Sequence, residues 1–337
     1  MASALRILAL GPNPALQRVL TFEDELHLGG VNRASAVSRY VGGKGQGVAF
    51  ALNRWAPLSV SVAQFVGGDT GVFVENELAR QGIECISQHT EAHTRICTTL
   101  IGKSTEGKST EGLCTELIDP SGTVREEECQ CLLAHLEQRL ALKADFGGIA
   151  LCGTTPPGAA ALYERLCEKI MGLPQILLLD GFKGIEGVLN SGRLDVLKIN
   201  VDEVKALTGA AGPREAAHLL LHAKNAPLCR PGSLLALTDG AGAALLFSKS
   251  GRSWQISVPR IRCVNAIGAG DVCTGVFLHS LVIARATAKG MEEDAAEAFA
   301  WGIAAACARC TREQPNFERE EVEKMRACIS ISEISAA

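Results

Sequence analysis

Apolar runs of strand length alternate with helix-length segments from about residue 58 onward. The strand-like runs are "LSVSVAQFVG", "FGGIALCG", "QILLLD", "LDVLKIN" and "SLLALTDG", and several of them end in Gly, Asp or Asn. The segments between them that have helical periodicity are 70–81, 158–171, 184–190 and 214–224. This alternation predicts a mostly parallel β-sheet with helices on both faces, and ligands at the carboxyl ends of its strands.

Two regions interrupt this alternation, at about 15–40 and about 85–124. The second contains "HTRICTTLIGKS" and "LCTELIDPSG", whose alternating patterns predict the two strands of a hairpin. Its tip, 104–112, is a short duplication followed by a strand pattern, which predicts a flexible, solvated turn and no phosphate loop. We expect the two regions to form a small β-sheet separate from the main one.

The two ends of the chain continue the α/β pattern. The start, "MASALRILALGPNPAL", lacks the charged region and spacer of a secretory signal, so we interpret it as a first buried strand. The C-terminal third is helical, with periodic segments at 271–288, 291–309 and 318–328.

Composition narrows the class of protein. The 337 residues are 47% apolar with a net charge of −4, and no basic stripe of the kind that binds nucleic acid is present. No window of about 18 uncharged apolar residues appears, so we expect no membrane partner. Of the 13 cysteines, Cys307 and Cys310 form a C-x-x-C inside an Ala-rich helical pattern, without a second pair to complete a zinc site. We therefore expect free thiols and a cytoplasmic protein.

The stretch "VNAIGAGDVCTGVFL" carries the clearest chemistry. Gly268, Ala269 and Gly270 form a small-residue turn that leads into a helix, so their backbone N–H groups can bind an anion. The acid that follows, Asp271, could take a proton from an attacking hydroxyl. It could equally serve as a helix cap, and the stretch alone leaves both interpretations open.

Three further stretches add to this signal, and two of them support two interpretations. "YVGGKGQGVAFAL" is a second Gly-rich turn that leads into a helix. Asn200 and Glu203 could hold a hydrated Mg²⁺ through water, or could form a helix capping box. After another strand, Gly240 and Gly242 would let a nucleotide lie close to the backbone, or would form an ordinary hairpin turn.

Taken in order along the chain, these motifs resemble the ribokinase-like family, the PfkB carbohydrate kinases. Its G-G-x-G signature is matched by Gly42, Gly43, Lys44 and Gly45, its G-A-G-D signature by residues 268–271, and its N-x-x-E motif by Asn200 and Glu203. The resemblance implies a single ribokinase-like α/β/α domain over 1–337. It also implies a β-sheet lid, often used for dimerisation, which we expect at about 12–40 and 85–124.

The resemblance also implies roles for these residues. Asp271 would be the base, and the amides of Gly268, Ala269 and Gly270 would form the anion hole. ATP and Mg²⁺ would be the cofactors. Their proposed contacts are Asn200 and Glu203, which would support the metal through water, together with Lys198, Thr238, Gly240 and Gly242.

Within the family, the chain is most similar to the 1-phosphofructokinase and tagatose-6-phosphate kinase branch, through "NPAL", "GGVNRASAV", "HTRICTTLI", "TELIDPSG" and "GTTPPG". Acceptors of that branch already carry a phosphate. Arg95 and Lys44 are therefore expected to bind it, beside the Gly42-Gly43 turn, with Arg33 a further candidate. The alternative for such cations is an exposed charge on a lid strand.

The chain departs from that branch mainly in the parts that read the sugar. Gln17 stands where the branch has Asp, and Gly47 and Ile118 where it has Asn. Ile199 replaces a Pro, and Val264-Asn265 replaces an Asp-Thr. We therefore predict a working kinase for a sugar or a sugar phosphate, with an acceptor site that differs from its relatives.

Two alternatives stay open at this stage. One is a non-catalytic sugar- or nucleotide-binding regulatory protein of the same fold, which the altered Gln17 and Gly47 would fit. The other is a kinase of a nucleoside or another polyol, although few aromatic residues are present to hold a base. A dehydrogenase is excluded, because no G-x-G-x-x-G follows the first strand. A homodimer through the lid is a further expectation.

Overall fold

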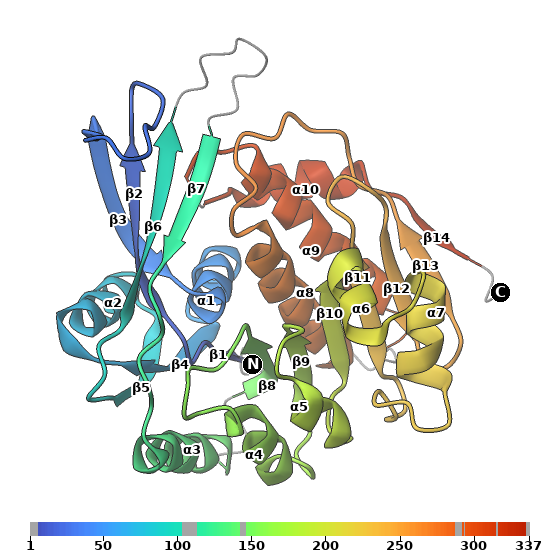
Figure 1. The fold of residues 1–337 in the computed structure, drawn as a ribbon. Helices are drawn as coiled ribbons and strands as arrows, with labels where there is room; N and C mark the ends of the chain where they lie inside the picture. Colours follow the sequence, from blue (N-terminus) through green and yellow to red (C-terminus); the bar gives the residue numbers. More distant parts are fainter. Residues whose placement is uncertain are drawn as a thin grey trace.

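A central ten-stranded sheet organises the protein, as the computed structural model in Figure 1 shows. The structure describes residues 6–102, 113–141, 146–286, 292, 294–314 and 316–334. The strand order is β14-β13-β12-β11-β10-β9-β8-β1-β4-β5. The parallel strands are β1 (Arg6–Leu10), β4 (Val60–Val66), β5 (Glu84–His89), β8 (Phe146–Cys152), β9 (Ile176–Asp180), β10 (Val196–Asn200) and β11 (Leu234–Thr238). The antiparallel edge consists of β12 (Ala244–Ser248), β13 (Ser253–Ile256) and β14 (Ile331–Glu333).

Helices cover both faces of this sheet, because its strands are apolar on both sides. In β1, Ile7 and Ala9 join one buried cluster, whereas Leu8 and Leu10 join the other. The first cluster is completed by α1 (Lys44–Trp55), α2 (Gly68–Arg80), α8 (Ala269–Ala286), α9 (Ala295–Cys310) and α10 (Arg319–Ala327). The second is completed by α3 (Glu126–Ala141), α4 (Leu162–Lys169), α5 (Glu186–Asn190), α6 (Val201–Thr208), α7 (Pro213–Ala217) and the π-helix at His218–His222. The predicted fold of three layers around a mostly parallel sheet is confirmed.

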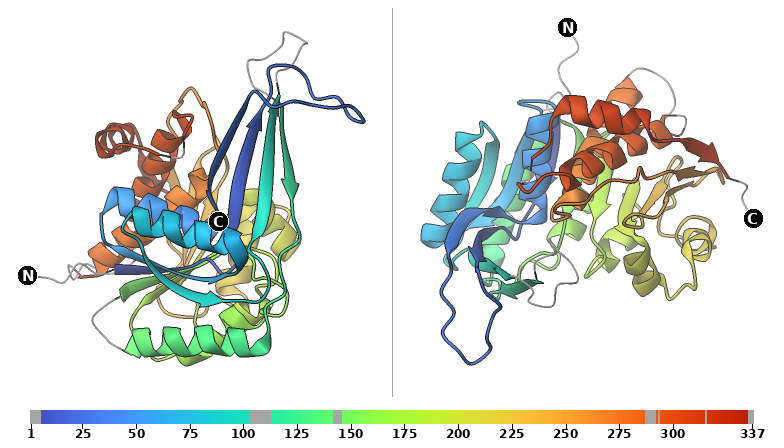
Figure 2. Two further views of the ribbon diagram at one scale, coloured as in Figure 1. Left: turned by 90° about the vertical axis from the view of Figure 1, so that its left-hand side faces the viewer. Right: turned by 90° about the horizontal axis from the view of Figure 1, so that it is seen from above.

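A second, four-stranded sheet has the order β3-β2-β6-β7 and projects from the body, as Figure 2 shows. Its strands are β2 (Ala15–Thr21), β3 (Ala36–Gly42), β6 (Arg95–Gly102) and β7 (Leu113–Ile118), and we call it the lid sheet. The range expected for its second half begins too early, because Glu84–His89 is β5 and pairs with β4 in the central sheet. The predicted turn at 104–112 lies outside the described residues.

The predicted helices differ from the observed ones mainly at their ends. The segment 158–171 contains only α4, and 214–224 is divided between α7 and the π-helix. The long helix α3 was not predicted, although Leu132, Leu133 and Leu136 lie on its buried face. The helix α8 has the length and hydropathy of a membrane span, but 56% of that window is buried within the protein. It packs against α1 and α9 as a core helix.

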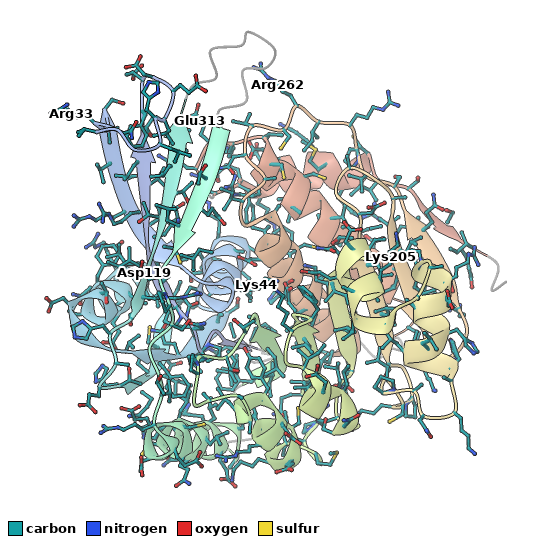
Figure 3. The ribbon with its side chains drawn as sticks, viewed as in Figure 1. Arg33, Lys44, Asp119, Lys205, Arg262 and Glu313 are labelled. Carbon is teal, nitrogen blue, oxygen red and sulfur yellow. The ribbon has the colours of Figure 1, made fainter. Side chains whose placement is uncertain are left out.

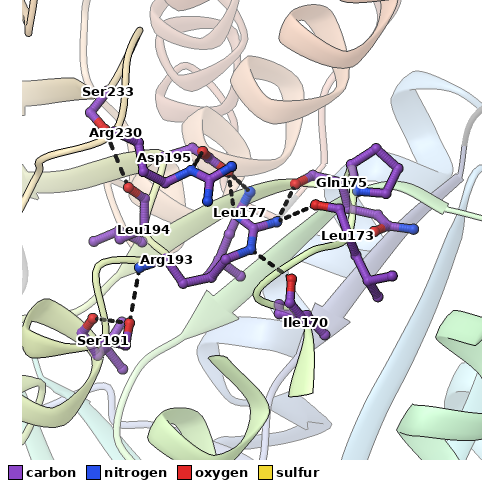
Figure 4. Close-up of polar contacts among 12 residues, drawn as sticks. Ile170, Leu173, Gln175, Leu177, Ser191, Arg193, Leu194, Asp195, Arg230 and Ser233 are labelled. Atoms are coloured by element: carbon purple, nitrogen blue, oxygen red, sulfur yellow. Dashed lines mark hydrogen bonds and ion pairs between the residues drawn. The ribbon is translucent and has the colours of Figure 1, made fainter. Parts of the chain in front are cut away.

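A buried ionic cluster secures the amino ends of β9 and β10 (Figure 4). Arg193, whose side chain is fully buried, donates to the backbone carbonyls of Ile170, Leu173 and Gln175. It also donates to Asp195 at 2.7 Å. The Asp195 carboxylate accepts two further hydrogen bonds, from the backbone N–H of Leu177 and from Arg230.

Candidate active site

The candidate site is organised around Asp180, the last residue of β9, at the carboxyl edge of the central sheet. Its buried carboxylate accepts from Lys44 Nζ at 2.9 Å and from Lys198 Nζ at 3.3 Å. The Thr274 hydroxyl donates to it at 2.5 Å. Because Lys44 begins α1, Lys198 lies on β10 and Thr274 lies on α8, Asp180 joins the three elements that surround the site.

Charge pairing outweighs burial in this group. Burial alone would raise the pKa of Asp180, but Lys198 and Lys44 hold it below its usual value. Burial would likewise lower the pKa of Lys198, and the Asp180 charge raises it instead. All three side chains are therefore charged at neutral pH.

Asp271 lies in the first turn of α8 and has a different environment. Burial, followed by the negative charge of Asp180, raises its pKa to about 7, against the opposing effect of Lys44 and Lys198. Within the described part of the chain, the half-buried Asp271 carboxylate accepts no hydrogen bond. The helix-cap interpretation therefore has no support, because a cap would accept from a first-turn amide. A carboxylate with a pKa near neutrality can instead take up and release protons.

The turn before Asp271 has the geometry of a helix start. Gly268 has a φ of 80°, in the left-handed region that favours glycine. The Ala269 amide already donates to the carbonyl of Ala266 at 3.1 Å. No acceptor for the amides of Gly268 and Gly270 is found among the residues that the structure describes. These two amides are thus the available donors of the predicted anion hole.

Lys198 was expected near the residues that would support Mg²⁺ and the ATP phosphates. Its side chain is buried and only 5% exposed. Its ammonium group donates to the Gly270 carbonyl at 3.1 Å as well as to Asp180. Its position is therefore beneath the turn that precedes Asp271, where it holds the backbone.

A cavity of about 170 Å³ opens beside this network. It is lined by Gly11, Asn13, Lys44, Gln46, Arg95, Cys152, Gly153 and Thr154. Arg95, at the foot of the lid sheet, donates to the Asn13 carbonyl at 3.2 Å, while its buried Nε has no partner in the part of the chain that the structure describes. Lys44 also reaches this cavity, with its side chain 42% exposed. The cavity thus presents two cations at the junction of the lid and the central sheet.

Figure 3 distinguishes Lys44 from the other cation named in the sequence. Lys44 lies between the foot of the lid sheet and the central sheet, whereas Arg33 lies at the outer end of the lid. Arg33 is exposed and lies on no wall of the cavity. The structure therefore removes Arg33 from the candidate site.

The Gly42-Gly43 turn connects the lid sheet to α1. Gly43 has a φ of 115°, and a side chain there would also overlap the buried Gln46 amide. Gly42 pairs with Ala15 in the lid sheet and lies next to Gln17. The Gln17 amide donates to the Thr99 hydroxyl at 2.8 Å, within the lid sheet, and leaves its carbonyl oxygen as an acceptor.

The predicted nucleotide residues lie further along the same sheet edge. Asn200 and Thr238 end β10 and β11 and are paired in register. Asn200 and Glu203 form the capping box of α6, with reciprocal hydrogen bonds of 2.7 and 2.9 Å. Gly240 and Gly242 lie in the hairpin turn between β11 and β12, with a φ of 53° at Gly240. Both structural alternatives are thus present, and Asn200 and Gly240 are exposed at this edge.

The donor set at this edge fits a hydrated metal better than a protein-enclosed one. No group of three or more His, Cys, Asp or Glu side chains that could hold a metal occurs in the described ranges. Mg²⁺ commonly keeps several waters and binds through one or two carboxylates and substrate phosphates. The half-buried Glu203, with one carboxylate oxygen outside the capping box, fits that mode.

Asp180 and Thr274 are the residues that the sequence reasoning missed. Asp180 ends the apolar run "QILLLD", and a carboxylate directly after a buried strand was the available signal. Thr274 lies one helical turn after Asp271, within hydrogen-bond distance of both Asp180 and the Gly270 carbonyl. Its position in an apolar helix gave no sequence signal of a polar role.

Comparisons with known proteins agree with this geometry. The family model for the pfkB family of carbohydrate kinases matches residues 15–321. Tagatose-6-phosphate kinase of Staphylococcus epidermidis is 24% identical over 281 residues, which cover 82% of this chain and 85% of that protein.

Solved structures are similar over nearly the whole chain. Phosphofructokinase-2 from Escherichia coli in complex with fructose-6-phosphate has a TM-score of 0.78 at 20% identity, covering 96% of this chain and 99% of that one. Ribokinase from Giardia lamblia has a TM-score of 0.75 at 18% identity, covering 95% and 99%. At these identities the structures establish a shared fold.

Proposed function

Because the chain belongs to the pfkB family of carbohydrate kinases, we propose that it transfers the γ-phosphoryl group of ATP to a hydroxyl of a sugar phosphate, with Asp271 as the general base. One observation carries this proposal. The Asp271 carboxylate has no hydrogen-bond partner among the described residues and a pKa of about 7, and it interacts electrostatically with Lys44, which lines a cavity together with Arg95. A proton acceptor and an anion-binding wall are the two requirements of such a transfer.

Asp271 and the turn that precedes it have separate roles in the proposed reaction. Asp271 accepts the proton of the acceptor hydroxyl while the oxygen of that hydroxyl forms a bond to the γ-phosphorus. The bond from that phosphorus to the β-phosphate oxygen breaks, and ADP leaves with the electron pair. The amides of Gly268 and Gly270, which have no acceptor among the described residues, would stabilise charge on the transferring group, with Ala269 between them. Lys198 holds the Gly270 carbonyl and so fixes the turn.

The nucleotide is proposed to bind along the ends of β10 and β11. Thr238, Gly240 and Gly242 would lie beside it, because the hairpin turn carries small side chains that permit close approach. Asn200 and Glu203 would hold Mg²⁺ through water. The bound metal would neutralise charge on the ATP phosphates.

The acceptor is proposed to carry a phosphate of its own. Among the described residues, Arg95 donates to one backbone carbonyl and its buried Nε has no partner, so an incoming oxyanion would complete its hydrogen bonding. The relatives named above are a tagatose-6-phosphate kinase and a phosphofructokinase with bound fructose-6-phosphate, which supports a hexose phosphate. Gln17 would read a sugar hydroxyl with its free carbonyl oxygen, beside Gly42 and Gly43.

The lid sheet is also proposed to mediate a homodimer in the cytoplasm. Val37 and Leu117, which the strand register places on one face of this sheet, are 55% and 52% exposed. Apolar side chains on a sheet that projects from the body are a surface on which a second copy could pack (Figure 2). Size measurement by light scattering tests this assembly, and a monomer would exclude it.

Consumption of ATP with Mg²⁺ tests the function, using hexoses, hexose phosphates, pentoses and nucleosides as acceptors. Turnover is expected with a hexose phosphate. Arg95→Gln should raise KM for that acceptor by about 10- to 100-fold, as loss of a charge-assisted contact predicts. Arg39→Gln is the matched control, because Arg39 is an exposed cation on the same sheet outside the cavity.

The other outcomes separate the alternatives. Turnover only with unphosphorylated acceptors or nucleosides would contradict the phosphate-binding role of Arg95. ATP binding without any consumption across the panel would support the non-catalytic regulatory protein, for which the altered Gln17 and Gly47 are the motivation.

A further inference from the structure

Gly47, in the first turns of α1, directly faces the Asp271 side chain. A Cβ added to Gly47 would overlap the Asp271 Oδ2 atom and would lie 3.0 Å from both its Cβ and its Cγ. No other side chain or backbone is among the three nearest neighbours of that position. The space left by the missing side chain of Gly47 is therefore the space that the Asp271 carboxylate occupies.

The backbone at Gly47 does not itself require glycine. Its φ is outside the left-handed region, and its N–H makes an ordinary helical hydrogen bond of 2.9 Å to the Gly43 carbonyl. Alanine in such a helical position is normally favoured over glycine by about 1 kcal/mol. The contact with Asp271 is thus the feature that opposes a larger residue at this position.

We propose that Gly47 is the positioning residue of the base: its lack of a side chain lets the Asp271 carboxylate lie against α1. This inference rests on the proposed role of Asp271 as the base. It also gives Gly47 a role of its own, whereas the sequence alone indicated only that a sugar contact is missing at this position. At this position the chain lacks a side chain that could contact the acceptor, and the space is occupied by the Asp271 carboxylate instead.

The position against α1 determines which charges the carboxylate meets. Lys44 reaches it from α1, Asp180 from β9 and Lys198 from β10, while Cys152 on β8 lies close enough for mutual electrostatic influence. Burial and Asp180 raise the pKa of Asp271 to about 7, so the base becomes protonated, and activity is lost, as pH falls below about 7. A side chain at position 47 would turn the carboxylate towards solvent and reduce its burial. Its pKa would then fall, and the acid limb of the pH profile would move to lower pH.

Gly47→Ala tests this inference, with Gly275→Ala as the matched control. Gly275 lies on α8 and faces Leu52 and Val48 of α1, so its variant disturbs the packing of the same two helices without touching the carboxylate. Gly47→Ala should lower kcat by about 10- to 100-fold, because displacing a catalytic group by about 1 Å or less already slows the reaction. It should also shift the acid limb of kcat/KM to lower pH. Gly275→Ala should leave that limb in place.

A thermal unfolding cycle tests the contact independently of activity. In an Asp271→Ala background, Gly47→Ala should raise Tm by about 1–3 °C, the gain of a helical alanine. With Asp271 present, the same substitution should give no such gain. If Gly47→Ala unfolds the protein with Asp271 present but not without it, the contact is confirmed; if it unfolds both, the inference is wrong.

The two proposals fail separately. If Asp271→Asn keeps its activity, the role of Asp271 as base is wrong. The other case is that Asp271→Asn is inactive, but Gly47→Ala has the same kcat and the same acid limb of the pH profile as Gly275→Ala. Only the inference about Gly47 is then overturned.

Discussion

Two buried ionic clusters lie at opposite ends of the same two strands, β9 and β10. At the amino ends, Asp195 accepts from Arg193, Arg230 and a backbone N–H, and Arg193 is fully buried. At the carboxyl ends, Asp180 accepts from Lys44, Lys198 and Thr274. Both clusters place one buried aspartate between two cations.

The difference between them lies in what surrounds the aspartate. The Asp195 cluster is closed, because Arg193 donates its other hydrogen bonds to three backbone carbonyls (Figure 4). The Asp180 cluster is open, because Lys44 reaches a cavity and the neighbouring Asp271 accepts no hydrogen bond from the described residues. A closed cluster can only hold strands together, whereas an open one can exchange protons and bind ligands.

The largest effect that should separate the two clusters is on stability. Asp195→Asn removes the charge that pairs with the buried Arg193, so the free energy of unfolding should fall by about 3–5 kcal/mol. Urea unfolding measures this loss. The kcat of the molecules that remain folded should be unchanged, and a large fall in kcat would show that the amino-end cluster also serves the reaction.

The same substitution at the other end should act mainly on turnover. Asp180→Asn leaves Lys44 free to pair with Asp271 and loosens the hold of Lys198 on Gly270, so kcat should fall by about 100-fold, or about 2.7 kcal/mol. Because the Asp180 charge raises the pKa of Asp271, the acid limb of the pH profile should also move to lower pH. Steady-state kinetics across pH measure both effects. If Asp180→Asn lowered stability but left kcat and the acid limb of the pH profile unchanged, both clusters would have only a structural role.

Much of the fold could be predicted from the sequence, because burial on both faces leaves a continuous apolar run in each parallel strand. The runs "QILLLD" and "LDVLKIN" correspond to β9 and β10, and the start of the chain to β1. The antiparallel strands β13 and β14 were missed because they have only four and three residues, too few for a clear hydrophobic pattern. The helix α3 was missed even though its leucines have helical spacing.

The site was only partly predictable, because sequence motifs mark turns and not the contacts between them. The turn at 268–270 and its acid were recognised from their order along the chain. The burial of Lys198 beneath that turn, and the fit of Asp271 against Gly47, depend on how α1, α8 and β10 pack. Asp180 is separated from Lys44 by 136 residues in the sequence, so no local pattern could pair them.

Turnover of the Asp271→Asn variant with ATP, Mg²⁺ and the preferred sugar phosphate tests most directly whether Asp271 is the base. We expect kcat to fall by about 10²–10⁴-fold, the contribution of a general base, while Tm and ATP binding stay close to those of the unaltered protein. If the variant turned over within a few-fold of the unaltered protein, Asp271 would not be the base, and the open cluster at the carboxyl ends of the strands would need another role.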